Sequence, residues 1–145
     1  MIIALSLMAS YHTWRRQLDT DAYQRLIDGV NKSDSIEAVV DQHGIIRAWS
    51  EGAEWSMGWE RDFAIGHGPG FLMTDQEGGV KHHESFDRAM SDFDGAEYHT
   101  RLECEIRDTQ NNNRLVEITN HVFAIEGKPY VKTEIVEPRS IKRLK

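Results

Sequence analysis

The stretch Val39–Glu54, Val-Val-Asp-Gln-His-Gly-Ile-Ile-Arg-Ala-Trp-Ser-Glu-Gly-Ala-Glu, decides the fold of this chain. Two short apolar runs, Ile36–Val40 and Ile45–Trp49, flank an Asp-Gln-His-Gly sequence, which predicts two antiparallel strands joined by a tight turn closed by glycine. Ser50 is a suitable helix N-cap, and the acidic residues after it would lie where the helix dipole favours negative charge. We therefore expect a hairpin followed by a short helix that ends at Gly58.

After the hairpin, the apolar pattern is first helical and then alternating. Residues 79–92 predict a helix, with Val80, His83, Phe86, Ala89 and Met90 near one side. Residues 96–107 alternate apolar with charged residues, which is typical of a half-buried antiparallel strand. Polar turns then lead to two further strands, residues 114–125 and 129–136. The glycine-rich residues 66–70 are expected to form a loop.

The N-terminal part of the chain predicts an amphipathic helix over about residues 5–30. Its apolar residues recur every three or four positions, which places them on one face. A helix of this length is stable only when that face is covered, either by the domain that follows or by a second copy of the chain. The residues expected at such an interface are Leu7, Tyr11, Trp14 and Leu18.

Composition excludes several classes of function. The chain has 145 residues, a net charge of −7 and one cysteine, which suggests one domain in a reducing, cytoplasmic compartment. Residues 34–136 hold nine basic and twenty acidic residues, which is a poor match to nucleic acid. The apolar start is too short to cross a membrane. No nucleophile or acid–base arrangement indicates an enzyme.

In order and spacing, these elements resemble a PAS domain. Val39–Glu54 looks like the first hairpin and helix of that family, and Trp55–Trp59 followed by Ala64-Ile65-Gly66 continues the likeness. The resemblance covers residues 34–137. It implies an α+β fold, a five-stranded antiparallel sheet of order 2-1-5-4-3 with short helices on one face. The expected organisation is an N-terminal helix (1–33), the PAS-like domain (34–137) and a basic tail (138–145).

The resemblance also implies a space between sheet and helices that is either filled or holds haem, flavin or a small organic acid. His82 looks like the proximal ligand of haem-binding PAS domains. One alternative is that His82 is a surface or capping histidine. Another is that the helix turns His83 inward instead. Metal binding by side chains alone is not expected. The residues expected to bind a ligand are His82, Phe86, Met90, Leu102, Cys104 and Trp49.

Cys104 bears on the flavin alternative. Light-sensing flavin domains need a reactive cysteine on a helix, whereas Cys104 lies on an expected strand between Glu103 and Glu105. Those carboxylates would raise the pKa of the thiol, so a small buried apolar role is favoured. Non-covalent flavin stays open, as do haem and no cofactor.

Two functions remain. The first is a sensory domain that binds a small ligand, forms a homodimer through its N-terminal helix and acts on a separate signalling protein. Its signal would be a population shift between two arrangements of helix and sheet. The alternative is a ligand-free dimerisation or docking module whose pocket is filled by Trp, Phe and Met side chains.

Overall fold

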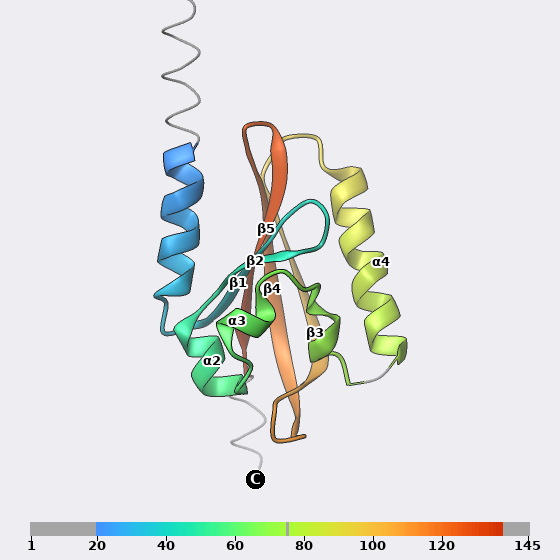
Figure 1. The fold of residues 1–145 in the computed structure, drawn as a ribbon. Helices are drawn as coiled ribbons and strands as arrows, with labels where there is room; N and C mark the ends of the chain where they lie inside the picture. Colours follow the sequence, from blue (N-terminus) through green and yellow to red (C-terminus); the bar gives the residue numbers. More distant parts are fainter. Residues whose placement is uncertain (1–19, 75, 138–145) are drawn as a thin grey trace, which may run out of the picture.

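A five-stranded antiparallel sheet forms the centre of the molecule (Figure 1). The computed structural model describes residues 20–74 and 76–137, apart from the side chains of residues 76–82. The strand order is β2-β1-β5-β4-β3, which confirms the expected order. The strands are β1 (Ile36–Val40), β2 (Ile46–Trp49), β3 (Tyr98–Arg107), β4 (Asn113–Ile125) and β5 (Lys128–Val136).

Short helices cover one face of this sheet, as expected (Figure 1). They enclose the main core together with apolar side chains from every strand. The helices are α2 (Glu51–Met57), α3 (Arg61–Ala64), the 3-10 helix η1 (Pro69–Leu72) and α4 (Gln76–Asp92). Two boundaries differ from the sequence expectations. The glycine-rich loop gives way to η1 at Pro69, and α4 begins three residues before position 79.

The hairpin and the first helix have the local structure that their sequence predicts. The Asp41 carboxylate accepts hydrogen bonds from the backbone N–H groups of His43 and Ile45, and Gly44 takes the positive φ of 77° that closes the turn. Ser50 caps α2 by accepting from the N–H of Ala53 at 3.0 Å. The helix ends at Gly58, which is left-handed.

An N-terminal helix, described here for residues 20–31, packs on the other face of the sheet. Val30 is buried there against Val39 of β1 and Ala48 of β2, and the ring of Tyr23 contacts that of Tyr130 on β5. This part of the helix is therefore covered by its own chain. The expected interface residues Leu7, Tyr11, Trp14 and Leu18 lie outside the described residues.

None of the helices within the described ranges combines the length and apolar character needed to cross a membrane.

Candidate functional site

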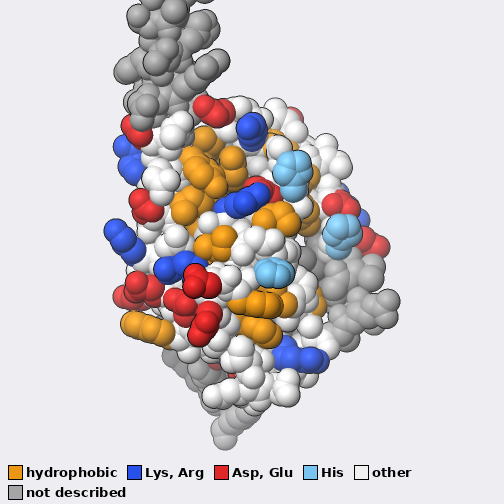
Figure 2. Space-filling view, viewed as in Figure 1, with side chains coloured by type: hydrophobic (Ala, Val, Ile, Leu, Met, Phe, Trp, Pro, Cys, Tyr) orange, Lys and Arg blue, Asp and Glu red, His pale blue; other side chains and the backbone are white. Residues whose placement is uncertain are grey.

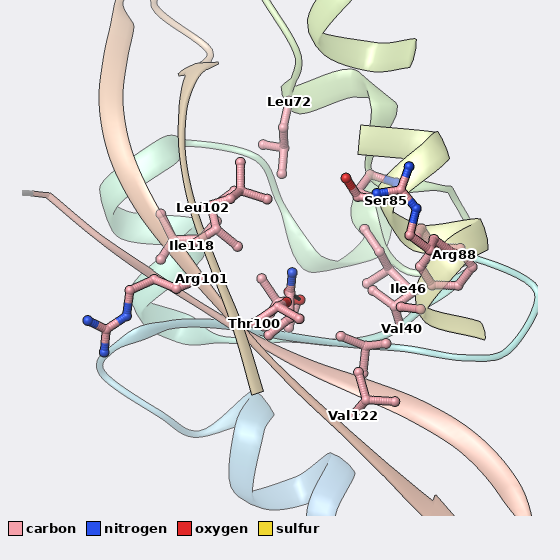
Figure 3. A pocket seen from close by; sticks show the side chains of 18 of the residues that line it. Val40, Ile46, Leu72, Ser85, Arg88, Thr100, Arg101, Leu102, Ile118 and Val122 are labelled. Atoms are coloured by element: carbon pink, nitrogen blue, oxygen red, sulfur yellow. Dashed lines mark hydrogen bonds between the residues drawn. The ribbon is translucent and has the colours of Figure 1, made fainter. Parts of the chain in front are cut away.

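A cavity of about 340 Å³ lies between the helix-covered face of the sheet and helices α4 and η1 (Figure 3). All five strands contribute to its wall, and most of the contributing side chains are apolar. This volume is at the lower end of the range found for ligand pockets, about 300–1,000 Å³. Its size is suited to a small organic molecule.

The floor of the cavity consists of three rows of side chains that run across the sheet. Residues directly opposite each other in antiparallel strands point to the same face, so the strand registers define the rows. Two rows are apolar apart from one tyrosine hydroxyl. They are Val40, Val131, Val122 and Tyr98 on one side, and Ile135, Ile118 and Leu102 on the other.

The middle row is polar. It starts at Ala38 on β1 and continues with Thr133 on β5, Asn120 on β4 and Thr100 on β3. The hydroxyl of Thr133 donates to Oδ1 of Asn120 at 2.8 Å. All four residues line the cavity. A strip of hydrogen-bonding groups therefore lies between two largely apolar rows.

The polar and charged side chains contributed by α4 and β3 are exposed, and they mark the mouth of the cavity. They are Ser85, Arg88, Asp92, Thr100 and Arg101. In Figure 3, the side chain of Arg101 points away from the cavity, whereas Arg88 lies beside Ser85 on α4. Charge is thus confined to the entrance, between α4 and the edge strand.

The six residues predicted to bind a ligand fall into three groups by their position relative to the cavity. Trp49, Phe86 and Leu102 line the cavity. Met90 and Cys104 are half-buried and pack against the main core without lining the cavity. His82 lies on α4 with its side chain outside the described residues. A role for any of them in ligand binding stays a prediction.

The alternative in which His83 turns inward is excluded. Its side chain is 76% exposed, and its ring nitrogen lies 3.2 Å from the carboxylate of Asp87, one turn further along α4. Phe86, Ala89 and Met90 pack against the core and so set the rotation of α4. That rotation leaves His83 and Asp87 on the solvent side of the helix.

Sequence reasoning missed Asn120, Thr133 and Thr100. The alternation of residues 96–107 places Thr100 on the same face as Tyr98 and Leu102, but a lone threonine in a strand is not a functional signal. Only the register of β3, β4 and β5 shows that the three polar side chains are adjacent.

Trp49 connects the cavity to its surroundings. The ring lies in the cavity wall, and its Nε1 donates to the carbonyl of Trp59 at 2.8 Å. Its backbone N–H donates to Oδ1 of Asn31 at 2.9 Å, while its carbonyl accepts from Nε of Arg61. The guanidinium of Arg61 also donates to the carbonyl of Asn31. The end of the N-terminal helix is thereby joined to the cavity wall and to α3.

Helix α4 is held to the edge strand by a tyrosine. The hydroxyl of Tyr98 donates to the carbonyl of Ala89 at 2.9 Å. Burial raises the pKa of Tyr98, and the charges of Asp92 and Asp94 raise it further. The hydroxyl therefore keeps its proton and remains a donor at neutral pH.

Burial raises the pKa of the Cys104 thiol. The expected cause of the raised pKa, the charges of Glu103 and Glu105, is wrong because neighbouring residues of a strand point to opposite faces. The thiol is on the core side, where desolvation disfavours the thiolate.

The structure around the cavity is relevant to haem and flavin, the two cofactors that the sequence left as alternatives. The volume of the cavity lies within the range of pockets that hold a small organic molecule. Cys104 is on β3, not on a helix. Among the side chains of residues 20–74 and 83–137, no three His, Cys, Asp or Glu residues are grouped in a way that could hold a metal ion.

Comparison with family models finds no match, and no curated protein sequence matches the chain. Solved structures do match. The PAS domain of an HTR-like protein from Haloarcula marismortui has a TM-score of 0.60 at 16% identity, and the match covers 87% of this chain and 99% of that one. The PAS domain of BvgS from Bordetella pertussis has a TM-score of 0.64 at 10% identity, over 86% and 94% of the two chains.

A third similar structure contains a ligand. It is the PAS domain of the quorum-sensing receptor RpfR from Cronobacter turicensis in complex with C12:0, with a TM-score of 0.54 at 17% identity. The match covers 74% of this chain and 97% of that one. Together with the strand order and the helices on one face, these likenesses show that the chain has the PAS fold.

Proposed function

We propose that this chain is a sensory domain that binds a small organic ligand between its sheet and α4 and acts through association with another protein. The observation that carries the proposal is the 340 Å³ cavity with a polar row in its floor. A core that served packing alone would fill this space with side chains. Domains of the same fold are described as sensors, among them a quorum-sensing receptor and a sensor histidine kinase.

The expected mechanism is a population shift. A ligand can change the position of an element only if it binds one arrangement better than another. Trp49 lies in the cavity wall and is hydrogen-bonded to Asn31 at the end of the N-terminal helix. A ligand that moved Trp49 would therefore change the contacts of that helix. We further propose that this helix forms a homodimer through its part before residue 20, and that the protein is cytoplasmic and not an enzyme.

The experiment is a thermal-shift screen of the full chain against organic acids, neutral aliphatic compounds, haem and flavins. We expect at least one compound to raise the melting temperature. The variant Ala89→Phe would place a ring in the cavity wall and should abolish that shift, while Ala124→Phe, at an exposed position outside the wall, should keep it. A flat response of the unmodified chain across the whole panel would overturn the ligand-binding proposal.

The docking module is the second candidate, and exposed aromatic residues favour it. Trp55 of α2 is 77% exposed and Phe63 of α3 is 41% exposed. Figure 2 shows acidic side chains beside hydrophobic ones over α2 and α3. Exposed apolar surface of this kind is typical of protein interaction sites.

The homodimer has its own test. The full chain should sediment as a dimer, and a chain truncated before Asp34 should sediment as a monomer. An unchanged oligomeric state would contradict the dimer.

A further inference from the structure

The middle row of the cavity floor holds hydrogen-bond donors that no described residue of the protein uses. Asn120 accepts from Thr133 through Oδ1. The amide nitrogen of Asn120 and the hydroxyl of Thr100 have no hydrogen-bond partner among the described residues. Because the oxygen of the carboxamide is turned towards β5, its NH₂ group is directed away from Thr133, where it can reach the cavity and Thr100.

A ligand in this cavity must replace the water on these groups. When a ligand displaces water from polar groups without offering hydrogen bonds of its own, binding weakens. A plain hydrocarbon over Asn120 would leave its NH₂ group unpaired, which costs more than an ordinary hydrogen bond gains. The row therefore selects for a ligand with an acceptor at this position.

The charges around the row indicate that this acceptor is neutral. Of the residues that line the cavity, the charged ones are Arg88, Asp92 and Arg101, and all three are exposed at the mouth. Figure 3 shows Arg101 pointing away from the cavity. Asn120 is hydrogen-bonded to Thr133, and neither Arg88 nor Arg101 forms a hydrogen bond with it. A carboxylate at Asn120 would therefore lose water without gaining an ion pair there, which is costly. A carbonyl oxygen has two lone pairs, which match one N–H of Asn120 and the O–H of Thr100.

We propose that the ligand is an uncharged, mainly aliphatic carbonyl compound whose oxygen accepts hydrogen bonds from Asn120 and Thr100. Its hydrocarbon parts lie on the two apolar rows, against Val122 and Val131 on one side and Ile118 and Ile135 on the other. Thr133 is a positioning residue, because its hydroxyl fixes which way the Asn120 carboxamide faces. This inference rests on the proposed function and names the ligand class of the same cavity.

The test compares three probes of equal chain length, 2-octanone, octanoate and 1-octene, by NMR titration of the full chain. For the unmodified protein, we expect 2-octanone to bind about tenfold more tightly than 1-octene, since one polar group that a ligand covers without a matching hydrogen bond is worth about that factor. Octanoate should bind more weakly than the ketone. Equal affinity for ketone and alkene, or tighter binding of octanoate, would overturn the proposal.

Variants test whether Asn120 and Thr100 of the middle row cause the preference for ketone over alkene. Asn120→Leu should reduce the preference for ketone over alkene to about threefold or less, and Thr100→Val, at an exposed and more tolerant position, should reduce it partly. Thr119→Val changes the neighbouring residue of β4, which points to the other face, and should leave the preference intact. A preference that survives in both Asn120→Leu and Thr100→Val would contradict the assignment.

The outcome also separates this inference from the proposed function. If none of the three probes binds but other compounds of the thermal-shift panel do, the cavity is a ligand site of another class, and only the carbonyl proposal fails. If the whole panel leaves the melting temperature unchanged, both proposals fail.

Discussion

The backbone N–H of Trp49 donates to Oδ1 of Asn31 at 2.9 Å, so a residue of the cavity wall holds the end of the N-terminal helix. The two residues are 18 positions apart in the sequence, and the helix lies on the face of the sheet away from the cavity. The bond therefore joins the two sides of the sheet at the end of β2.

Removal of this bond should loosen the helix. Asn31→Ala leaves the N–H of Trp49 without its acceptor, and we expect a loss of about 1 kcal/mol in the free energy of unfolding. Hydrogen exchange should accelerate for residues 20–31 before it does for the sheet. Asn113→Ala, at an exposed position at the start of β4, is the matched control and should change neither quantity. An equal effect of both variants would contradict a specific role for Asn31.

Gly52 is expected to tolerate no side chain. A Cβ at this position would overlap the backbone carbonyl of Asp34, which cannot move away as a flexible side chain can. Gly52→Ala should therefore lower the free energy of unfolding by about 1–3 kcal/mol in urea denaturation. Gly29→Ala is the opposite case, because nothing lies within 4 Å of its Cβ. At this exposed position of the N-terminal helix, the alanine should raise the free energy of unfolding by about 0.5–1 kcal/mol. The prediction fails if both variants change stability in the same direction.

Asp41 should make stability depend on pH. Burial raises the pKa of its carboxyl, but the hydrogen bonds from Arg47 and from the N–H groups of Ile45 and His43 outweigh burial, so the net pKa is lowered. A carboxyl with a lowered pKa in the folded state stabilises above its unfolded pKa of about 3.9. That contribution is lost as pH falls through the folded value.

The measurement is urea denaturation between pH 7 and pH 3. Asp41→Asn should be less stable than the unmodified chain at pH 7, and the difference should narrow below about pH 4. Asp62→Asn changes the net charge equally at an exposed position of α3 and serves as the control. A difference that stays constant over this range would show that the Asp41 carboxylate contributes nothing specific.

Cys104 should react slowly with alkylating reagents. Burial raises the pKa of its thiol, so the reactive thiolate is scarce at neutral pH. Iodoacetamide at pH 7.5 should label the native chain much more slowly than the urea-unfolded chain, as followed by mass spectrometry. Equal labelling rates would mean that the thiol is accessible and ionised as in a free peptide.

Local signals in the sequence predicted the hairpin and the two ends of α2, at Ser50 and Gly58. They could do so because turns and helix caps depend on residues close together in the sequence. Helices α3 and η1 were not placed, because their few residues are fixed by distant partners. One example is Arg61, which donates to the carbonyl of Trp49. The segment that leads into α3 is fixed in the same way, since Nε1 of Trp59 donates to the carbonyl of Arg107.

The site was less predictable than the fold. Trp49, Phe86 and Leu102 could be placed near the cavity by face and order alone. The polar row could not, because it depends on the registers of β4 with β3 and with β5, and a shift of one residue would turn Asn120 to the other face. Whether space remains above the row depends on the position of α4, which no local pattern determines.

The order of the strands also has a consequence for synthesis of the protein. Of the five strands of this sheet, β5 is the last to leave the ribosome, yet it stands between β1 and β4. Until residues 128–136 are available, the two hairpins β1–β2 and β3–β4 each have an open edge that can pair with another chain. A nascent or truncated chain is therefore expected to aggregate, and folding should wait for this long-range pairing and be slow. Incorporation of β5 is the step that protects the molecule.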